Sequence, residues 1–250
     1  MTEPAAVKQT ETIKDRIIVA LDVDSAAKAC EVMGDLRGEV GTFKIGLQLF
    51  TAAGVAFVRE VAESGVKIFL DLKFHDIPNT VANAAVEAAR LGVWMFNVHA
   101  LGGKEMMQRT ADAVGETCEK EGIVRPKVVA VTVLTSSNVE TLKEAGIETS
   151  VESEVGRLAK LAADSGLDGV VASPHEIGVV RKTVSEKDFL IVTPGIRPFN
   201  ATNDDQKRVM TPAEAISAGS NYLVIGRPIV QAKDRVGAVN EILASIGSDS

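Results

Sequence analysis

Charged residues at a spacing suited to chemistry lie between positions 71 and 76. Asp71, Lys73 and Asp76 alternate in sign, and the first two are two residues apart, so on a strand they point to the same face. Lys44 and Asp22 add charges to two earlier apolar runs. Charges in the mouth of a folded domain are costly unless they pair, and alternating signs provide that pairing. Such a set is either a structural salt-bridge cluster or a catalytic site, and five charges on three neighbouring strands favour the catalytic site.

The elements that would position these charges recur in a regular order. Eight apolar, strand-like runs cover Arg16–Asp22, Thr42–Gly46, Lys67–Lys73, Met95–Ala100, Lys127–Leu134, Gly169–Ala172, Phe189–Thr193 and Tyr222–Ile225. Helices are predicted after these strands, over Ala26–Leu36, Val55–Glu63, Thr80–Leu91, Lys104–Glu121, Glu152–Ser165, His175–Lys182, Pro212–Ala218 and Lys233–Ser245. Several strands are nearly continuous runs of Val, Ile and Leu, which is typical of parallel strands covered on both faces.

Alternating strands and helices predict an α/β protein with a (β/α)8 TIM-barrel fold in a single domain. A doubly wound open sheet is the alternative, but it needs a glycine-rich phosphate loop after the first strand, where this chain has Asp22–Ser25. We expect residues 16–246 to form the catalytic barrel and residues 1–15 an N-terminal tail. Catalytic groups of such barrels project from the carboxyl ends of the strands, where the five charges fall. The segment Pro194–Thr211 is rich in Pro, Gly, Asn and Asp, and we predict a lid or binding loop there.

The composition excludes several classes of function. With 46% hydrophobic and 24% charged residues, the 250-residue chain is predicted to fold as a globule. It has no apolar run of about 18 residues that could span a membrane. A net charge of −7 argues against binding to nucleic acid. The first 14 residues lack the apolar core of a secretory signal, so we expect a cytoplasmic protein whose cysteines, Cys30 and Cys118, are reduced.

The segment Asp71–Thr80, DLKFHDIPNT, resembles the signature of the orotidine 5′-phosphate decarboxylase family in its bacterial form. Its Asp-x-Lys-x-x-Asp core is shared by a wider superfamily, whereas the extension through His-Asp-Ile-Pro-Asn-Thr is much more specific. Further motifs of the family occur in the family order, and the resemblance spans residues 16–245. These motifs are Leu21-Asp22, Phe43–Gly46, Leu134–Ser136, Pro194–Arg197, Gln206 and Ile225–Pro228.

The resemblance implies conversion of orotidine 5′-monophosphate to uridine 5′-monophosphate and CO2 in pyrimidine biosynthesis. It also implies a homodimer that uses neither a metal nor an organic cofactor. Loss of CO2 leaves a carbanion at C6 of the pyrimidine, and Lys73 as an ammonium would stabilise it and donate the proton. Asp71 would crowd the substrate carboxylate, and Lys44 would hold Asp71 and Lys73 in place. Asp76 would come from the partner subunit and complete the alternating array.

The same resemblance assigns the substrate-binding groups. They are Asp22, Lys44, Asp71, Thr80, Thr135, Ser136, Pro194, Arg197, Gln206, Gly226 and Arg227. Arg227 and the Gly226 amide would bind the phosphate, and Arg197 and Gln206 would close over the substrate from the lid. Thr80 would again come from the partner. Either of the hydroxyl-bearing residues at 135 and 136 could contact the pyrimidine, and the sequence leaves that choice open.

Two rival functions remain as alternatives, and roles can be considered for three histidines. A superfamily relative acting on a sugar phosphate through a metal-stabilised enediolate would share the Asp-x-Lys-x-x-Asp core, and a non-catalytic nucleotide-binding barrel would share the fold. No His, Cys and carboxylate spacing resembles a zinc site. His75 could pack or take part in catalysis, His99 could line the mouth, and His175 is expected to be structural.

Overall fold

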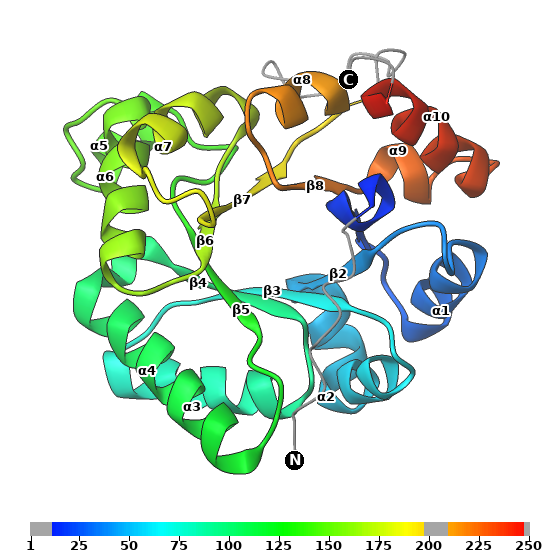
Figure 1. The fold of residues 1–250 in the computed structure, drawn as a ribbon, viewed down its shortest axis with the longest axis horizontal. Coiled ribbons are helices and arrows are strands. Elements are labelled where there is room, and N and C mark those ends of the chain that lie inside the picture. Colours follow the sequence, from blue (N-terminus) through cyan, green and yellow to red (C-terminus); the bar gives the residue numbers. More distant parts are fainter. Residues whose placement is uncertain (1–11, 198–209, 248–250) are drawn as a thin grey trace, which may run out of the picture.

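The computed structural model describes residues 12–197 and 210–247. Eight parallel strands form a closed barrel in the order β1 to β8, so the predicted TIM-barrel fold is confirmed (Figure 1). The strands are β1 Ile17–Ala20, β2 Thr42–Gly46, β3 Ile68–Phe74, β4 Met95–His99, β5 Lys127–Val131, β6 Gly169–Val171, β7 Leu190–Pro194 and β8 Tyr222–Ile225.

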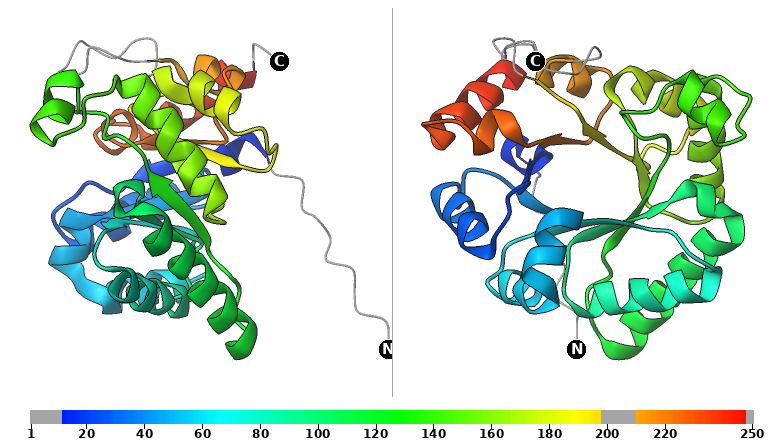
Figure 2. Two further views of the ribbon diagram at one scale, coloured as in Figure 1. Left: turned by 90° about the vertical axis from the view of Figure 1, so that its left-hand side faces the viewer. Right: turned by 180° about the vertical axis from the view of Figure 1, so that it is seen from behind.

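Helices follow the strands and form a ring outside the barrel, as views from opposite sides show (Figures 1 and 2). The helices are α1 Ala26–Asp35, α2 Leu47–Glu63, α3 Pro78–Arg90, α4 Gly103–Glu121, α5 Val139–Glu144, α6 Val151–Asp164, α7 Ile177–Thr183, α8 Pro212–Ser217, α9 Arg227–Val230 and α10 Arg235–Gly247. Short 3-10 helices cover Ile13–Arg16, Ala100–Gly102 and Pro174–Glu176. In the described part of the chain, none of the helices has the length and apolarity needed to cross a membrane.

Helix α2 begins eight residues before the start expected at Val55. Gly54 has φ 75° within it and kinks the helix. The kink interrupts the 3.6-residue period, which is why only the second half was predicted. Helices α5 and α9 were not predicted, because six and four residues are too few to show that period.

Two apolar layers hold the barrel together. The inner layer contains only strand residues and those beside them, so it fills the barrel: Ile18, Ala20, Phe69, Met95, Val129, Val192, Tyr222 and Val224, with Trp94, Val171 and Leu190 packed against it. The outer layer joins the alternate strand residues, such as Ile17 and Val19, to the apolar faces of the helices. This alternation is the period of two expected for strands that are covered on both sides.

The amino end of the barrel is closed by aromatic rings. Trp94 and Tyr222 meet edge to face with centroids 5.2 Å apart, and Lys67 Nζ lies 5.8 Å from the Trp94 ring centroid. Arg16 donates hydrogen bonds to the carbonyl oxygens of Ser220 and Asn221 on the same end. These contacts pack side chains across the amino end of the barrel, opposite the carboxyl ends where the charged residues lie.

Two glycines make a matched test of this packing. A Cβ added at Gly169 would lie 2.3 Å from the Leu190 carbonyl oxygen on the paired strand, whereas one added at Gly115 on α4 meets nothing within 4 Å. We expect Gly169→Ala to destabilise the fold by about 1–3 kcal/mol, because the two strands must separate. Gly115→Ala should stabilise it by about 0.5–1 kcal/mol, because alanine favours the helix. Thermal unfolding of both variants measures this, and equal midpoints would contradict the close approach of β6 and β7.

Candidate active site

Four of the predicted charges meet at the carboxyl end of β1 to β3. Lys44 Nζ lies 3.2 Å from Asp22 Oδ1 and 3.3 Å from Asp71 Oδ2. Lys73 Nζ donates a hydrogen bond of 2.7 Å to Asp71 Oδ1. The signs therefore alternate from Asp22 through Lys44 and Asp71 to Lys73. We call these four residues the charge relay, a name that describes their alternating charges and implies no proton transfer between them.

Burial increases toward the middle of this charge relay. The side chains of Lys44 and Asp71 are 10% and 14% exposed, whereas those of Lys73 and Asp22 are 32% and 62% exposed. Burial by itself raises the pKa of Asp71, but the charges of Lys44 and Lys73 and the hydrogen bonds it accepts outweigh burial and hold that pKa below its ordinary value. Asp71 is therefore a buried carboxylate that stays ionised at neutral pH.

Lys73 has an unusual backbone conformation. Its φ of 53° makes it the one non-glycine residue with positive φ in the described ranges. The pairing of β3 with β4 shifts register between Leu70 and Phe74, which marks a bulge at this place. A left-handed conformation costs a side-chain-bearing residue about 1–2 kcal/mol. Such strain is typical of functional sites, where the surrounding structure holds it in place.

Asn97 on β4 is a site residue that the sequence analysis missed. It is 1% exposed, its Oδ1 accepts a 2.7 Å hydrogen bond from the Lys73 N–H, and its Nδ2 donates one of 2.7 Å to Asp71 Oδ1. The signal in the sequence was a polar residue within the apolar run Met95–His99. Buried amides of this kind require partners, so Asn97 indicated a polar group on a neighbouring strand.

Glycine leaves the room that the charges need. A Cβ at Gly46 would lie 2.9 Å from Lys44 Nζ, and one at Gly226 would lie 3.4 Å from Asp22 Oδ2. Gly46 ends β2 directly before α2, and Gly226 lies between the end of β8 at Ile225 and the start of α9. Both positions are therefore part of the site although they carry no side chain.

A cavity of about 160 Å³ opens beside the charge relay. Its lining residues are Lys44, Phe69, Asp71, Lys73, Val131, Val133, Leu134, Thr135, Val171, Ala172, Ser173, Pro194 and Val224. One wall is thus charged and the opposite wall is apolar. Of the two hydroxyl candidates, Thr135 lines the cavity and Ser136 is not among the lining residues. Ser173, after β6, is a further polar lining residue that was not predicted.

Other predicted residues lie outside this cavity. Asp76 is exposed and accepts a 2.6 Å hydrogen bond from the Ile77 N–H, and within the described ranges no ion pair joins it to Lys73. Thr80 is exposed in the first turn of α3. Arg227 is the first residue of α9, and Arg197 ends a described range with its N–H bonded to the Met210 carbonyl. The predicted ligand at position 206, a glutamine, lies outside the described residues.

Two of the histidines stack beside the mouth. The rings of His75 and His99 lie 5.4 Å apart at 22°, and His99 Nδ1 accepts a 3.3 Å hydrogen bond from the Leu101 N–H. Burial, with the charges of His75 and Lys73, lowers the pKa of His99 to about 4. His99 is therefore uncharged at neutral pH. His175 lies in the 3-10 helix Pro174–Glu176, away from this pair.

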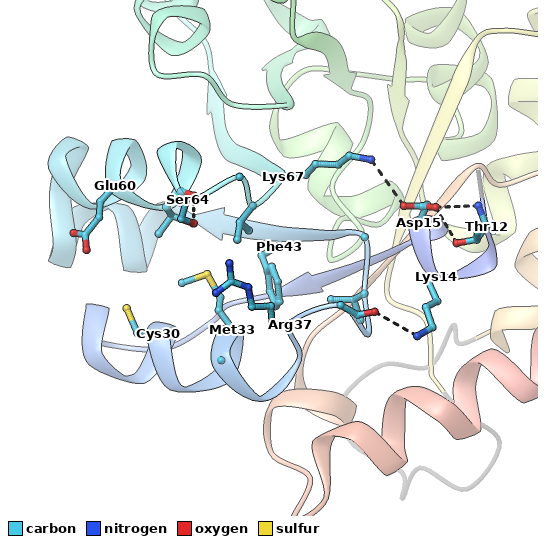
Figure 3. A pocket seen from close by; sticks show the side chains of 17 residues that line it. Thr12, Lys14, Asp15, Cys30, Met33, Arg37, Phe43, Glu60, Ser64 and Lys67 are labelled. Atoms are coloured by element: carbon cyan, nitrogen blue, oxygen red, sulfur yellow. Dashed lines mark hydrogen bonds and ion pairs between the residues drawn. The ribbon is translucent and has the colours of Figure 1, made fainter. Parts of the chain in front are cut away.

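Another cavity, of about 600 Å³, lies at the other end of the barrel between α1 and α2 (Figure 3). Several of its polar side chains have hydrogen-bond or ion-pair partners nearby. Asp15 accepts hydrogen bonds from Thr12 and lies 3.8 Å from Lys67 Nζ, and Lys14 Nζ lies 3.1 Å from a Glu39 oxygen. The described residues contain no group of three or more His, Cys, Asp or Glu side chains that could hold a metal ion. The cavity of about 160 Å³ is the candidate active site, because the charged residues Lys44, Asp71 and Lys73 line it at the carboxyl ends of the strands.

Removing one lysine tests the electrostatics of this cluster. In Lys44→Met, Asp71 loses one of its two cations, and breaking a buried pair costs about 3–5 kcal/mol. A carboxyl group whose pKa is lower in the folded state than in the unfolded state stabilises the fold at pH values above the unfolded-state pKa. That stabilisation is lost as the pH falls through the folded-state pKa. The free energy of unfolding of Lys44→Met should thus fall furthest below that of wild type near neutral pH, and the difference should shrink on acidification. Urea unfolding from pH 7 to pH 3 measures it.

Lys28→Met is the matched control for that measurement. Lys28 forms an exposed ion pair with Asp24, with side chains 60% and 61% exposed, so its loss should leave the free energy of unfolding nearly unchanged. A Lys44→Met deficit that is absent, or that does not change with pH, would contradict the assignment of Asp71 as a buried carboxylate.

Comparison with known proteins places this barrel in a family. A family model, "Orotidine 5'-phosphate decarboxylase / HUMPS family", matches residues 15–242. A protein named orotidine 5'-phosphate decarboxylase from Geobacter sulfurreducens is 57% identical over 233 residues, which cover 93% of this chain and 96% of the relative. One of the same name from Syntrophotalea carbinolica is 54% identical over 235 residues, covering 94% and 96%.

A solved structure agrees with the sequence relatives. The crystal structure of orotidine 5'-phosphate decarboxylase from Lactobacillus acidophilus superposes with a TM-score of 0.82 at 38% identity, covering 93% of this chain and 99% of that chain. The sequence relatives and the solved structure each span nearly the full length of the barrel. This chain therefore belongs to the orotidine 5′-phosphate decarboxylase / HUMPS family.

Proposed function

We propose that this protein decarboxylates orotidine 5′-monophosphate to uridine 5′-monophosphate and CO2, as a carboxy-lyase of pyrimidine biosynthesis in the cytoplasm, with no metal or organic cofactor. The observation that carries the proposal is the Lys44–Asp71–Lys73 arrangement on one wall of a cavity whose other lining residues are mostly apolar. The high identity to relatives named as this decarboxylase supports it over the other members of the family.

Lys73 is the group that we assign to proton transfer. The bond from C6 to the carboxylate breaks, and its electron pair stays on C6 while CO2 leaves. An ammonium at Lys73 stabilises that pair and then gives C6 a proton, after which the amine takes a proton from water. The apolar wall of Val131, Val171 and Leu134 keeps water away, so the charge interaction is stronger than it would be in solution.

Asp71 has a different role in the proposal. It faces the cavity between two lysines, where a substrate carboxylate would meet a fixed negative charge. That repulsion falls when CO2 leaves, so it favours the transition state over the bound substrate. Lys44 and Lys73 keep Asp71 ionised, which the repulsion requires.

The phosphate is assigned to the far side of the mouth. A cavity of about 160 Å³ is smaller than the 300–1,000 Å³ that holds a drug-sized ligand, so only part of the nucleotide fits inside it. Pro194 and Val224 line its edge toward β7 and β8, and Arg227 follows β8 directly. We therefore assign the phosphate to Arg227 and the Gly226 amide, with Arg197 and Gln206 closing over the substrate and Asp22 binding the ribose.

The proposal includes a homodimer with shared active sites. Ile77, Leu101 and Leu134 follow β3, β4 and β5 and are 67%, 44% and 42% exposed, so each loop after these strands presents apolar surface. A second copy would cover it, and an isologous dimer would bring Asp76 and Thr80 of each chain to the mouth of the other.

The first test is turnover itself. Wild-type protein should consume orotidine 5′-monophosphate, followed by loss of absorbance, at the same rate with and without EDTA. Lys73→Ala should lower kcat by at least about 10³-fold, because both the proton donor and the cation beside C6 are lost. Lys28→Ala, on the exposed surface, should retain wild-type turnover. No turnover by wild type, turnover abolished by EDTA, or a Lys73→Ala rate within tenfold of wild type would each contradict the proposal.

Mixed dimers test the shared site. Lys73→Ala and Asp76→Ala should each be nearly inactive alone. After subunit exchange in mild denaturant and refolding, half of the dimers are mixed, and each mixed dimer has one site with both residues intact. About a quarter of wild-type activity should return by that arithmetic. If size exclusion with differently tagged chains shows mixed dimers and activity stays at background, Asp76 does not serve the partner's site.

A further inference from the structure

Asn97 is buried where an apolar residue would be expected. Its neighbours on β4, Phe96 and Val98, are fully buried, and Asn97 itself is 1% exposed. A buried amide without partners costs a few kcal/mol, so its hydrogen bonds decide whether the position is tolerated. Both of the hydrogen bonds described above go to β3, and both go to residues of the charge relay.

The bulge in β3 explains why an amide is needed there. Leu70 pairs with Phe96 and Phe74 pairs with Val98, so the three residues between Leu70 and Phe74 stand opposite Asn97 alone. The regular ladder of backbone hydrogen bonds cannot continue through such a mismatch. The Asn97 Oδ1 accepts the Lys73 N–H at this point, 2.7 Å away, and thereby holds the residue whose φ is 53°.

The other end of the amide fixes the carboxylate. Asp71 Oδ1 accepts from both Asn97 Nδ2 and Lys73 Nζ, each at 2.7 Å, while Asp71 Oδ2 faces Lys44 at 3.3 Å. The amide orientation follows from its partners, because a flipped amide would set an oxygen against the carboxylate. Each end of Asn97 therefore has a distinct task that no apolar side chain can perform.

We propose that Asn97 is a positioning residue of the active site, which holds the strained backbone of Lys73 and orients the Asp71 carboxylate between the two lysines. It does not touch the reacting atoms, and it acts through Lys73 and Asp71. The link to catalysis rests on the proposed function, whereas the structural role can be measured without any turnover.

Two variants separate the two tasks of the amide. Asn97→Leu removes both hydrogen bonds. Asn97→Asp keeps the shape and the acceptor for the Lys73 N–H, but it sets a second carboxylate against Asp71. Two carboxylates in contact bind a proton more readily than one does, which raises the pKa of the pair. With that proton on residue 97, an O–H group replaces the Asn97 donor and the wild-type arrangement is restored.

The expected kinetics follow from this chemistry. Asn97→Leu should lower kcat by about 10²-fold or more, because small displacements of catalytic groups have effects of that size. KM should change only a few-fold, because the proposed phosphate site is distant from Asn97. Asn97→Asp should be most active at low pH and lose activity as pH rises and the pair ionises. The charged groups that face this pair are Lys44 and Lys73, and Asp22 lies beyond Lys44. His99 lies two residues further along β4 and is uncharged above about pH 4.

Thr110→Val is the matched control for these variants. Thr110 is fully buried on α4, in the ring of helices outside the barrel, and donates a 2.8 Å hydrogen bond to the Met106 carbonyl. Its replacement also removes one buried hydrogen bond, but kcat and the pH profile should stay at wild-type values. Asn97→Leu with kcat within threefold of wild type, or Asn97→Asp with the wild-type pH profile, would overturn the proposal.

An NMR measurement tests the structural half of the proposal independently of turnover. The short hydrogen bond should place the Lys73 amide proton downfield in wild type and in Asn97→Asp at low pH, and upfield in Asn97→Leu. An unchanged Lys73 amide shift in a folded Asn97→Leu would overturn the positioning role. If wild type shows the amide shift but no turnover of orotidine 5′-monophosphate, the proposed function fails and the positioning role stands.

Discussion

The Asp71 carboxylate, held between the Lys44 and Lys73 ammonium groups, is the interaction on which the rest of the site depends. A single buried charge would be prohibitively costly, and each of these three is stable only because its neighbour has the opposite sign. The pairing leaves one negative charge, on Asp71, and two positive charges, on Lys44 and Lys73, fixed at the wall of a small cavity. A substrate that loses a carboxylate and gains a proton at the same carbon meets first the negative charge of Asp71 and then the positive charge of Lys73, which is why we propose this reaction.

The barrel supplies what that interaction needs. Strands β2, β3 and β4 contribute one lysine, the aspartate with the second lysine, and the asparagine, in neighbouring positions of one rigid sheet. Trp94 and Tyr222 pack at the amino end, opposite the carboxyl end at which the charged residues lie. The bulge in β3 and the positive φ of Lys73 adjust one side chain locally without disturbing the barrel. Rigid surroundings of this kind let a site hold strain and charge that a flexible loop could not hold.

The sequence predicted the fold well because the signals were periodic. Each of the eight strands is an apolar run between helical segments, and all eight were found within a few residues of their bounds. Strand geometry also predicted that Asp71 and Lys73 lie close together on one strand and that Lys44 lies on the neighbouring strand. Asn97 was missed because its partners depend on a bulge, which no local pattern shows. Asp76 has no ion pair with the cluster within the described part of one chain, so the role that we propose for it requires a second copy.

Neutron diffraction from crystals of the wild-type protein, exchanged into D2O at neutral pH, tests the central claim most directly. The account predicts three deuterons on each of Lys44 Nζ and Lys73 Nζ and none on the Asp71 carboxylate. It also predicts that one deuteron on Asn97 Nδ2 points at Asp71 Oδ1. A deuteron on either Asp71 oxygen, or a lysine nitrogen with only two, would contradict an array of alternating charges in the mouth of this barrel.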